Sequence, residues 1–377
     1  MTTDFLRCTG RALVRMAVAL TTVGTLVAAP GCGGADQPGD VQPVSVMTRN
    51  LYLGADLSAV FFAGSMDDLT RLSGEVWRDI TDSRFRERAV ALAAEIAEAN
   101  PDIVALQEVS LFRSQTPSDW NGAATPNATD IEMDFLEVLL AELGAQGARY
   151  QFADGGVFTD QELPARAADG TSFDIRLADR NVTLVREGLT FASGPTAAFE
   201  AAFAFPVAGL TTLTLQRGYV TTDVTVGTKS VRVVNSHLEV GGPLGRTQEK
   251  QAEDLMIALA PHRGPILLAG DFNSPADMSG TKTYATLTTT TAASSGFRDA
   301  WLFRNRNSDS MQIGQVTGGT CCVQLTDTVL APRERIDLIL LRGAIQANDA
   351  RVVQPMKTPS GLWPSDHLGV FAQFQIQ

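Results

Sequence analysis

Strand-like runs of aliphatic and β-branched residues recur along most of this chain, and several end at a polar or acidic residue. Short runs of this kind, bounded by turn-forming residues, are typical of buried strands. We therefore predict strands over residues 44–48, 103–106, 182–186, 219–226, 230–235, 266–269, 336–341 and 368–374.

Helical spacing of apolar residues appears between some of these strands. The segment 85–99 has its apolar residues on one face of a predicted helix, and two further helices are expected over residues 131–143 and 246–259. Residues 112–129 are rich in Ser, Pro, Asn, Thr and Gly, which predicts a surface loop.

Strands interleaved with helices indicate an α/β sheet protein. The stretch 189–234 is nearly all β-type and rich in Thr, so mixed strand directions are expected rather than an all-parallel sheet. Neither a linker after Pro43 nor a repeat of fixed period is visible, and we therefore expect one domain over residues 44–377.

The beginning of the chain has the pattern of an export signal. Arg7, Arg11 and Arg15 precede an apolar run over residues 17–29. This run is short for a membrane span, because a spanning helix needs ~20 apolar residues. We therefore expect residues 1–31 to be a signal peptide and the protein to be exported.

Cys32 adds a second alternative for the route of export. It directly follows Gly31, begins a flexible polar tether over residues 32–43, and stands where a bacterial lipoprotein processing site would have its cysteine. Plain secretion and lipid attachment through Cys32, which would tether the protein to the outer face of a bacterial membrane, both stay open.

Cysteine usage bears on one further place in the chain. Cys8 lies in the signal and Cys32 at its end, which leaves the adjacent pair Cys321-Cys322 in the body. An oxidising compartment permits a disulfide between them, although two partly buried thiols fit the sequence equally well. Their loop and the loop around Trp120 are expected to border a cleft.

The composition is that of a globular protein, with 44% hydrophobic and 19% charged residues. The 30 basic and 42 acidic residues give a formal net charge of −12, which argues against a large basic surface for binding nucleic acid. A nuclease is not excluded, because carboxylates that hold metal ions count as negative in this balance.

Candidate chemistry gathers near the ends of the predicted strands. Two of the 3 histidines, His237 and His367, stand near such ends, and so do the acids Glu108, Asp271 and Asp337. Each residue alone is more often a structural or turn residue. Together they indicate a catalytic site.

Hydrolysis of a phosphoester would use these residue types. It needs a cation to offset the charge on the phosphate oxygens, a base for the attacking water, and neutral donors for the phosphate. Carboxylates suit hard divalent ions such as Mg²⁺, Mn²⁺ or Ca²⁺. Asn amides donate hydrogen bonds to phosphate, and His carries protons near neutral pH.

Six short motifs occur in an order that resembles the endonuclease/exonuclease/phosphatase superfamily, which has the DNase I-like fold. They are Thr48-Arg49-Asn50, Gln107-Glu108, Ser236-His237-Leu238, Gly270-Asp271-Phe272-Asn273, Arg335-Ile336-Asp337 and Ser365-Asp366-His367. The resemblance runs from Val46 to Phe374 and implies a four-layer α/β/β/α sandwich with the active site at one end.

The resemblance also implies a metal site. Glu108 corresponds to the principal metal ligand, Asn50 lies beside it, and Asp366 completes the site. The expected ion is Mg²⁺, with Mn²⁺ or Ca²⁺ as alternatives.

Five residues take the catalytic roles that the resemblance implies. Asp271 would orient or activate the attacking water, and Asn273 would hold the phosphate. His237 would hydrogen-bond a phosphate oxygen in the transition state. His367 would act in proton transfer or phosphate contact, held in one tautomer by Asp337.

Asn181, Arg217 and Tyr219 are candidate substrate-binding residues. Asn181 follows Asp179-Arg180, where many members of the superfamily have a Gly-Asn segment. Arg217 or Tyr219 could bind a phosphate oxygen, although a plain strand start explains both residues as well.

The sequence thus predicts an exported, metal-dependent phosphoester hydrolase, either a phosphodiesterase or a phosphatase. Lipid head groups, small phosphate esters and nucleic acid stay open as substrates, and the acidic balance slightly favours the first two. An extracellular endonuclease is the first alternative, and a non-catalytic binding module on the same fold is the second. No obligate protein partner is inferred.

Overall fold

The computed structural model describes residues 43–122, 125–207, 209–291, 295–304 and 318–377. The predicted signal peptide, Cys32 and the tether up to residue 42 lie outside these residues. Within the described ranges, no helix has the length and apolar character needed to cross a membrane.

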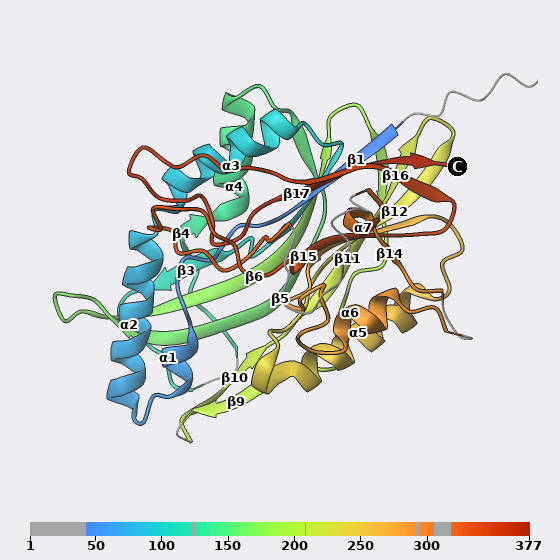
Figure 1. The fold of residues 1–377 in the computed structure, drawn as a ribbon. Coiled ribbons are helices and arrows are strands. Elements are labelled where there is room, and N and C mark those ends of the chain that lie inside the picture. The colour runs from blue at the N-terminus through green and yellow to red at the C-terminus, as the bar shows by residue number, and fades with distance from the viewer. Residues whose placement is uncertain (1–42, 123–124, 208, 292–294, 305–317) are drawn as a thin grey trace, which may run out of the picture. The chain divides into compact units, whose positions relative to one another are not determined.

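The first sheet has eight strands among the described residues, in the order β16-β17-β1-β2-β6-β3-β4, with β5 paired to β6 (Figure 1). Its strands are β1 (Pro43–Asn50), β2 (Ile103–Gln107), β3 (Leu111–Gln115), β4 (Asp130–Asp134), β5 (Tyr150–Arg166), β6 (Ser172–Arg186), β16 (Ile345–Val352) and β17 (Val370–Ile376). β1 runs parallel to β2 and antiparallel to β17, so strand directions are mixed as expected.

The second sheet has the order β14-β15-β13-β12-β11-β7, with β8 paired to β11. Its strands are β7 (Thr190–Ser193), β8 (Ala197–Ala198), β11 (Gly218–Val226), β12 (Lys229–His237), β13 (Ile266–Asp271), β14 (Arg298–Asp299) and β15 (Asp337–Arg342). β12 and β13 are parallel, whereas β13 and β15 are antiparallel. A separate hairpin joins β9 (Phe203–Val207) to β10 (Thr211–Leu215).

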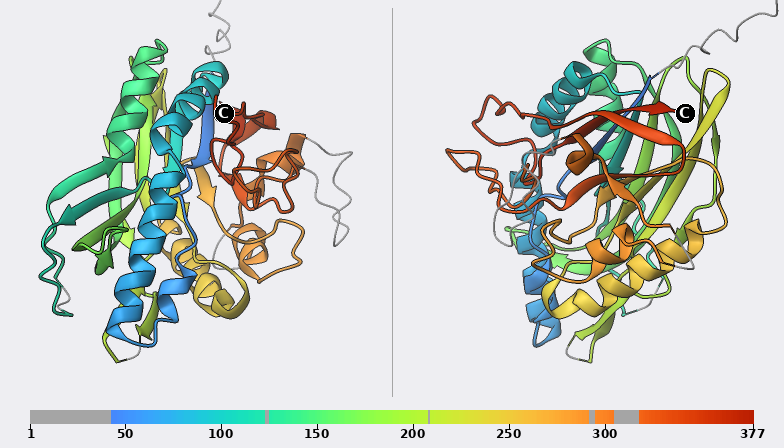
Figure 2. Two further views of the ribbon diagram at one scale, coloured as in Figure 1. Left: turned by 90° about the vertical axis from the view of Figure 1, so that its left-hand side faces the viewer. Right: turned by 45° about the vertical axis from the view of Figure 1, so that its right-hand side comes forward.

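Most helices lie on the outer sides of the two sheets, whereas α7 packs against β15 and β16, one strand of each sheet (Figure 1, Figure 2). Those of the described residues are α1 (Ser58–Phe61), α2 (Met66–Asp82), α3 (Phe85–Ala99), α4 (Phe135–Ala145), η1 (Gly242–Leu244), α5 (Gly245–Leu259), α6 (Thr283–Thr288) and α7 (Ala300–Arg304). The predicted helix over residues 85–99 has the bounds of α3.

Three groups of buried side chains define the layers. Between the sheets, Val44 and Ile103 of the first sheet belong to one core with Val231 and Leu267 of the second. A second core joins the first sheet to α2, α3 and α4, and a third joins the second sheet to α5 and α6. Full burial of a Val or Leu side chain stabilises by ~1.5–3 kcal/mol, so these cores hold the layers together. The predicted four-layer α/β/β/α sandwich is confirmed.

Three predicted elements were wrong in their bounds. The strand expected over residues 182–186 is only the end of β6, which begins at Ser172. The helix expected over residues 131–143 begins at Phe135, because the side chain of Asp134 caps it by accepting the N–H of Leu136 at 2.9 Å. The surface loop expected over residues 112–129 loses its first residues to β3, and Ala128 near its end is fully buried.

Candidate active site

Strand pairing brings the predicted site residues together. In the first sheet, Asn50 at the end of β1 lies beside the end of β2, which Glu108 follows. In the second sheet, His237 at the end of β12 pairs with Asp271 at the end of β13, and Asp271 pairs with Asp337 at the start of β15. Each sheet therefore supplies part of the site.

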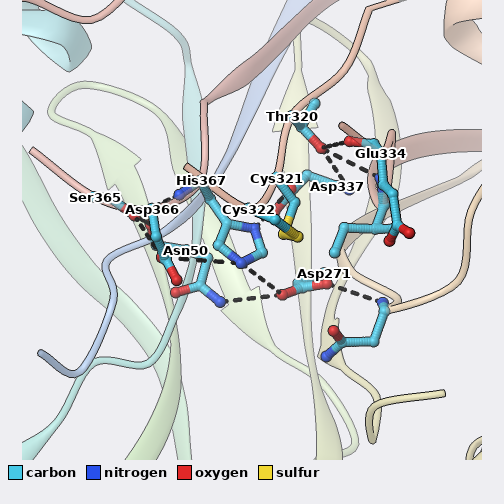
Figure 3. Close-up of a disulfide and its surroundings, with 12 residues drawn as sticks. Asn50, Asp271, Thr320, Cys321, Cys322, Glu334, Asp337, Ser365, Asp366 and His367 are labelled. Carbon is cyan, nitrogen blue, oxygen red and sulfur yellow. Dashed lines mark hydrogen bonds and ion pairs between the residues drawn. A yellow bond between two sulfur atoms is a disulfide. The ribbon is translucent and has the colours of Figure 1, made fainter. Parts of the chain in front are cut away.

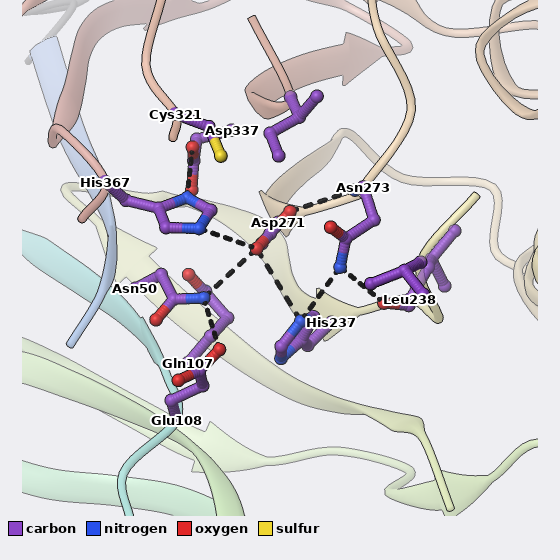
Figure 4. A network of polar contacts seen from close by, with 12 residues as sticks. Asn50, Gln107, Glu108, His237, Leu238, Asp271, Asn273, Cys321, Asp337 and His367 are labelled. Carbon is purple, nitrogen blue, oxygen red and sulfur yellow. Dashed lines mark hydrogen bonds and ion pairs between the residues drawn. The ribbon is translucent and has the colours of Figure 1, made fainter. Parts of the chain in front are cut away.

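Asp271 lies at the centre of the contacts (Figure 4). Its Oδ2 accepts a hydrogen bond from Nδ2 of Asn50 at 3.1 Å, and its Oδ1 accepts the backbone N–H of Asn273 at 2.9 Å. The same Oδ2 lies 3.6 Å from Nε2 of His237 and 3.7 Å from Nε2 of His367. Burial raises the pKa of Asp271 to about 7. Asp271 can therefore accept a proton near neutral pH.

His367 is oriented by Asp337. Its Nδ1 lies 2.8 Å from Oδ2 of Asp337, so Nδ1–H donates to the carboxylate and Nε2 faces Asp271. Burial alone would lower the pKa of His367, but the carboxylates of Asp337, Asp271 and Asp366 together raise it well above its ordinary value. His367 therefore carries a proton on Nε2 at neutral pH.

His237 has the opposite electrostatic setting. Nη1 of Arg217 lies 3.1 Å from Nδ1 of His237, and Nδ2 of Asn273, which also donates to the Leu238 carbonyl, lies 3.1 Å from Nε2. A guanidinium can only donate, and its charge-assisted bond is the stronger, so Nδ1 accepts and the ring proton sits on Nε2. Burial and the positive charges of Arg217 and His367 lower the pKa of His237 well below its ordinary value. His237 is therefore a neutral donor at Nε2.

The carboxylates of Glu108 and Asp366 fit a divalent cation. Oε1 of Glu108 accepts from Asn50 at 3.0 Å and Oε2 accepts the N–H of Leu53 at 2.6 Å, which leaves lone pairs on both oxygens. Burial and the negative charge of Glu108, against the charge of His367, raise the pKa of Asp366 to about 6. A cation would offset this charge, and oxygen ligands of this kind suit Mg²⁺, Mn²⁺ or Ca²⁺.

Asn50 is the weakest of the three predicted metal ligands. Its amide oxygen accepts the N–H of Tyr52 at 2.9 Å, while its Nδ2 holds both Glu108 and Asp271. Asn50 therefore spaces the two carboxylates, and its oxygen is free for a cation only through its second lone pair.

A second group of potential metal ligands overlaps the catalytic residues. One ligand atom each of Asp271, Asp337 and His367 lies within 4.8 Å of the others. Because Nδ1 of His367 is already hydrogen-bonded to Asp337, this group is better suited to moving a proton than to holding a cation.

Arg217 is held by two acids that the sequence did not single out as site residues. Its Nη1 lies 3.2 Å from Oδ2 of Asp179, and its Nε lies 3.7 Å from Oε2 of Glu239. Both acids are fully or nearly buried, so their charges fix the guanidinium beside His237. The available signal was their position in the sequence, because Asp179 starts the segment Asp179-Arg180-Asn181 and Glu239 directly follows the motif Ser236-His237-Leu238.

Asn181 and Tyr219 take structural positions. Nδ2 of buried Asn181 donates to the carbonyl of Gly218 at 3.2 Å, which ties β6 to β11 across the sandwich. Tyr219 belongs to the core under α5, and its ring lies 5.9 Å from that of Phe199. Of the three candidate substrate-binding residues, the described contacts therefore join only Arg217 to the cluster of Asp271.

Two buried arginines hold the backbone beneath the site. Arg88 donates to the carbonyls of Leu51 and Pro364 at 2.8 Å each, and thereby joins the segments that carry Asn50 and Asp366. Burial lowers the pKa of Arg88 to about 10, so it stays charged at neutral pH. Arg49 likewise donates to the carbonyl of His367 and pairs with buried Glu95.

Several residues of the site have a left-handed backbone. They are Tyr52 (φ 61°), Glu108 (φ 53°), Asn273 (φ 48°) and Cys322 (φ 79°). Such conformations cost ~1–3 kcal/mol each in non-glycine residues and persist only where the surroundings enforce them. Gly270, directly before Asp271, lies very close to β12. A Cβ at this position would lie 1.9 Å from a carbonyl oxygen of β12, so only glycine fits there.

Cys321 and Cys322 form a disulfide beside this site (Figure 3). The N–H groups of Cys322 and Val323 donate to the carbonyl of Asp366 at 3.0 and 3.1 Å. Cys321 also forms β-bridges to Glu334 and His367. The cysteine segment therefore joins the strand start that carries Asp337 to the segment that carries His367. Of the two alternatives for these cysteines, a disulfide or two partly buried thiols, the structure contains the disulfide.

The fold is that of DNase I-like proteins. A model of the Endonuclease/Exonuclease/phosphatase family matches residues 76–367, and the chain belongs to this family, whose members are typically phosphoester hydrolases. Family members generally use a divalent metal. A comparison with curated proteins found no match.

Solved structures share the fold at low sequence identity. A family member from Leptotrichia buccalis has a TM-score of 0.52 and 16% identity, over 87% of this chain and 98% of that chain. One from Bacteroides thetaiotaomicron has a TM-score of 0.51 and 14% identity, over 90% and 99%. One from Bacteroides vulgatus has a TM-score of 0.50 and 17% identity, over 89% and 100%. These similarities support the fold alone.

Proposed function

We propose that this protein is an exported, divalent-metal-dependent phosphodiesterase or phosphatase in which water attacks phosphorus. The observation that carries the proposal is the position of Asp271, whose Oδ2 lies 3.6 Å from Nε2 of His237 and 3.7 Å from Nε2 of His367. One carboxylate thus stands between a neutral and a charged imidazole, which is an arrangement for binding an anion and moving a proton.

The chain's own donors would hold the phosphate. Nε2–H of His237 and the amide of Asn273 lie 3.1 Å apart and can both donate to phosphate oxygens. Arg217 keeps His237 in the required tautomer from its other side. A divalent cation held by Glu108 and Asp366 would supply Lewis-acid stabilisation of the charge on phosphate.

Asp271 and His367 would move the protons. Asp271 takes a proton from the attacking water, the water oxygen bonds to phosphorus, and the ester P–O bond breaks. The leaving oxygen takes the proton from Nε2 of His367. The proton on Asp271 then returns to His367 across the 3.7 Å between them, which restores the starting state.

Hydrolysis of bis-p-nitrophenyl phosphate tests this function. We expect turnover with Mg²⁺, Mn²⁺ or Ca²⁺ and none with EDTA. Asp271→Ala and His367→Ala should each lower kcat at least ~10²-fold while circular dichroism stays native. His262→Ala, which changes the third histidine, is the matched control and should keep the rate. Turnover that ignores chelation, or none with any ion, would overturn the proposal and favour a non-catalytic binding module.

Plasmid DNA in the same assay tests the alternative of an extracellular endonuclease. A neutral histidine beside a charged one would suit any phosphoester. Residues outside this cluster must therefore determine which class of substrate is cleaved. Faster cleavage of DNA than of small esters would favour the nuclease.

Export and tethering through Cys32 belong to the same proposal and rest on the sequence of residues 1–32. Labelling with a fatty-acid analogue in a bacterial host separates the two routes. Label on the full chain that disappears in Cys32→Ala supports the lipid anchor. Unlabelled protein in the medium supports plain secretion, and protein retained inside the cell contradicts both.

A further inference from the structure

A largely apolar pocket is lined by residues of helices α1 and α2 and of the strands β5, β6 and β10, away from the catalytic cluster. Figure 1 shows where these elements lie. Its lining includes Val60, Trp77, Phe112, Leu177 and Leu213. None of the described residues that line it is charged. The pocket has a cavity volume of about 90 Å³, below the ~300–1,000 Å³ of pockets that enclose a whole small ligand, so it has room for only part of an extended chain.

Ser73 gives this pocket a single unsatisfied polar group. Its hydroxyl lies on α2 in the pocket wall, the residue is 3% exposed, and the Oγ has no hydrogen-bond partner among the described residues. A buried hydroxyl without a partner is costly, and native structures usually satisfy such groups. A ligand that is mostly apolar but carries one oxygen near Ser73 would satisfy it.

The pocket continues toward the catalytic cluster along β5 and β6. Gln161 and Leu177 are paired across these strands and both line the pocket, and Thr159 and Asp179 form the second pair from them in the direction of the site. Thr159 also lines the pocket, while Asp179 holds Arg217 at 3.2 Å. The pocket therefore reaches the strand pair whose Asp179 holds the arginine that orients His237.

Aromatic side chains lie next to the pocket on α1 and the β9–β10 hairpin. Phe61 lines the pocket, and its ring lies 5.7 Å from that of Phe205. The ring of Phe62 lies 6.1 Å from Phe205, and Phe62 is 77% exposed. An exposed apolar side chain beside an apolar pocket suits contact with an amphiphile.

We propose that this pocket holds the aliphatic chain of an amphiphilic phosphoester whose phosphate lies at Asp271. This inference rests on the proposed function and narrows it to lipid-like substrates. Nucleic acid fits poorly, because its binding draws on Lys and Arg contacts to phosphate and the pocket lining has neither.

Two phosphodiesters that differ only in chain length test the pocket. The esters are p-nitrophenyl methyl phosphate and p-nitrophenyl decyl phosphate, used with Mg²⁺ at concentrations where the decyl ester does not aggregate. Each buried methylene contributes about fourfold, so burial of a few of them should raise kcat/KM of the decyl ester at least ~10²-fold over that of the methyl ester. Equal kcat/KM values for the two esters would overturn the proposal.

Variants that fill the pocket give the matched comparison. Val76→Trp, in the lining, should remove the preference for the decyl ester and leave hydrolysis of the methyl ester unchanged. Val90→Trp adds the same side chain at an exposed position on α3 and should change neither ester. Ser73→Met adds less bulk to the pocket and removes the unsatisfied hydroxyl. If Val76→Trp does not fold, Ser73→Met tests in its place whether a filled pocket loses the preference for the decyl ester. A Ser73→Met protein that folds and keeps the full preference would refute the pocket.

Binding without turnover separates failure of the pocket from failure of the proposed function. Calorimetry with decyl phosphate in EDTA should show binding that Val76→Trp loses, and inorganic phosphate should show much weaker binding. If neither ester is hydrolysed with any divalent ion but decyl phosphate binds, the result supports the pocket and refutes the proposed function. If the methyl ester is hydrolysed and decyl phosphate does not bind, the result supports the proposed function and refutes the pocket as a binding site for the chain.

Discussion

The contact between Asp337 and His367 gives the sharpest test of the proton path. Oδ2 of Asp337 lies 2.8 Å from Nδ1 of His367. Asp337→Asn keeps the size of the side chain and removes its negative charge. A hydrogen bond to a charged group contributes ~1.5–3 kcal/mol. Because 1.36 kcal/mol corresponds to tenfold in rate, loss of this bond should lower kcat by roughly 10- to 150-fold.

The pH profile should change in a stated direction. In the wild type, burial opposes the charged form of His367, but the surrounding carboxylates raise its pKa well above the ordinary value, so the proton donor persists into alkaline pH. Without the charge of Asp337 this pKa falls, and the alkaline limb of kcat should move to lower pH.

The assay is kcat for bis-p-nitrophenyl phosphate with saturating Mg²⁺ across both limbs of the profile. Asp349→Asn is the matched control, because Asp349 pairs with Arg351 at the surface of β16. The control should keep both kcat and the limb. An Asp337→Asn protein with unchanged kcat and an unmoved alkaline limb would refute the role of Asp337.

Three further changes test other parts of the site. Glu108→Gln should weaken Mg²⁺ binding in calorimetry, since it removes one of two carboxylates; equal affinity would contradict the assignment. Reduction of the Cys321–Cys322 disulfide should lower kcat several-fold with KM little changed, because the backbone beside it loses a constraint. The double variant Cys321→Ala/Cys322→Ala should not respond to reductant, and a wild type that also does not respond argues against this role. Arg88→Met should lower the free energy of unfolding in urea by at least ~3 kcal/mol, because buried carbonyls lose their donor; a smaller change would show that other groups replace it.

Sequence patterns predicted the elements that carry the catalytic residues. The strands that end at Gln107 and Asp271 are short and buried throughout, which makes their apolar runs continuous. The family motifs predicted the convergence of Asp271 with both histidines, and in the structure Asp271 lies beside His237 and His367. Their catalytic roles stay predictions until the variants are assayed.

Other elements could not be read from apolar spacing. The buried face of α2 includes Thr70, Ser73 and Gly74 among its apolar residues, so its periodicity is diluted. β5 carries Gly155 and Gly156 within a mostly half-buried run, and glycine is depleted in strands. These two unpredicted elements form much of the apolar pocket.

The supporting side chains were missed because their partners are distant in the chain. Arg217 and Asp179 are 38 residues apart, and Arg88 and Pro364 are 276 apart. Charge and residue type do not reveal such pairs without the fold. The start of α4 was misjudged for a local reason, since Asp134 can either continue a helix or cap one.

The pairing of β1 with β17 has a consequence for synthesis on the ribosome. β17 is the most C-terminal of the described strands, yet it pairs with β1, and Val44 lies opposite Phe374. His367 lies shortly before β17. A nascent chain that ends before His367 therefore has β2 on one side of β1 but lacks β17 on the other side, and it also lacks the proposed proton donor. Such a partial chain is therefore expected to be inactive in hydrolysis.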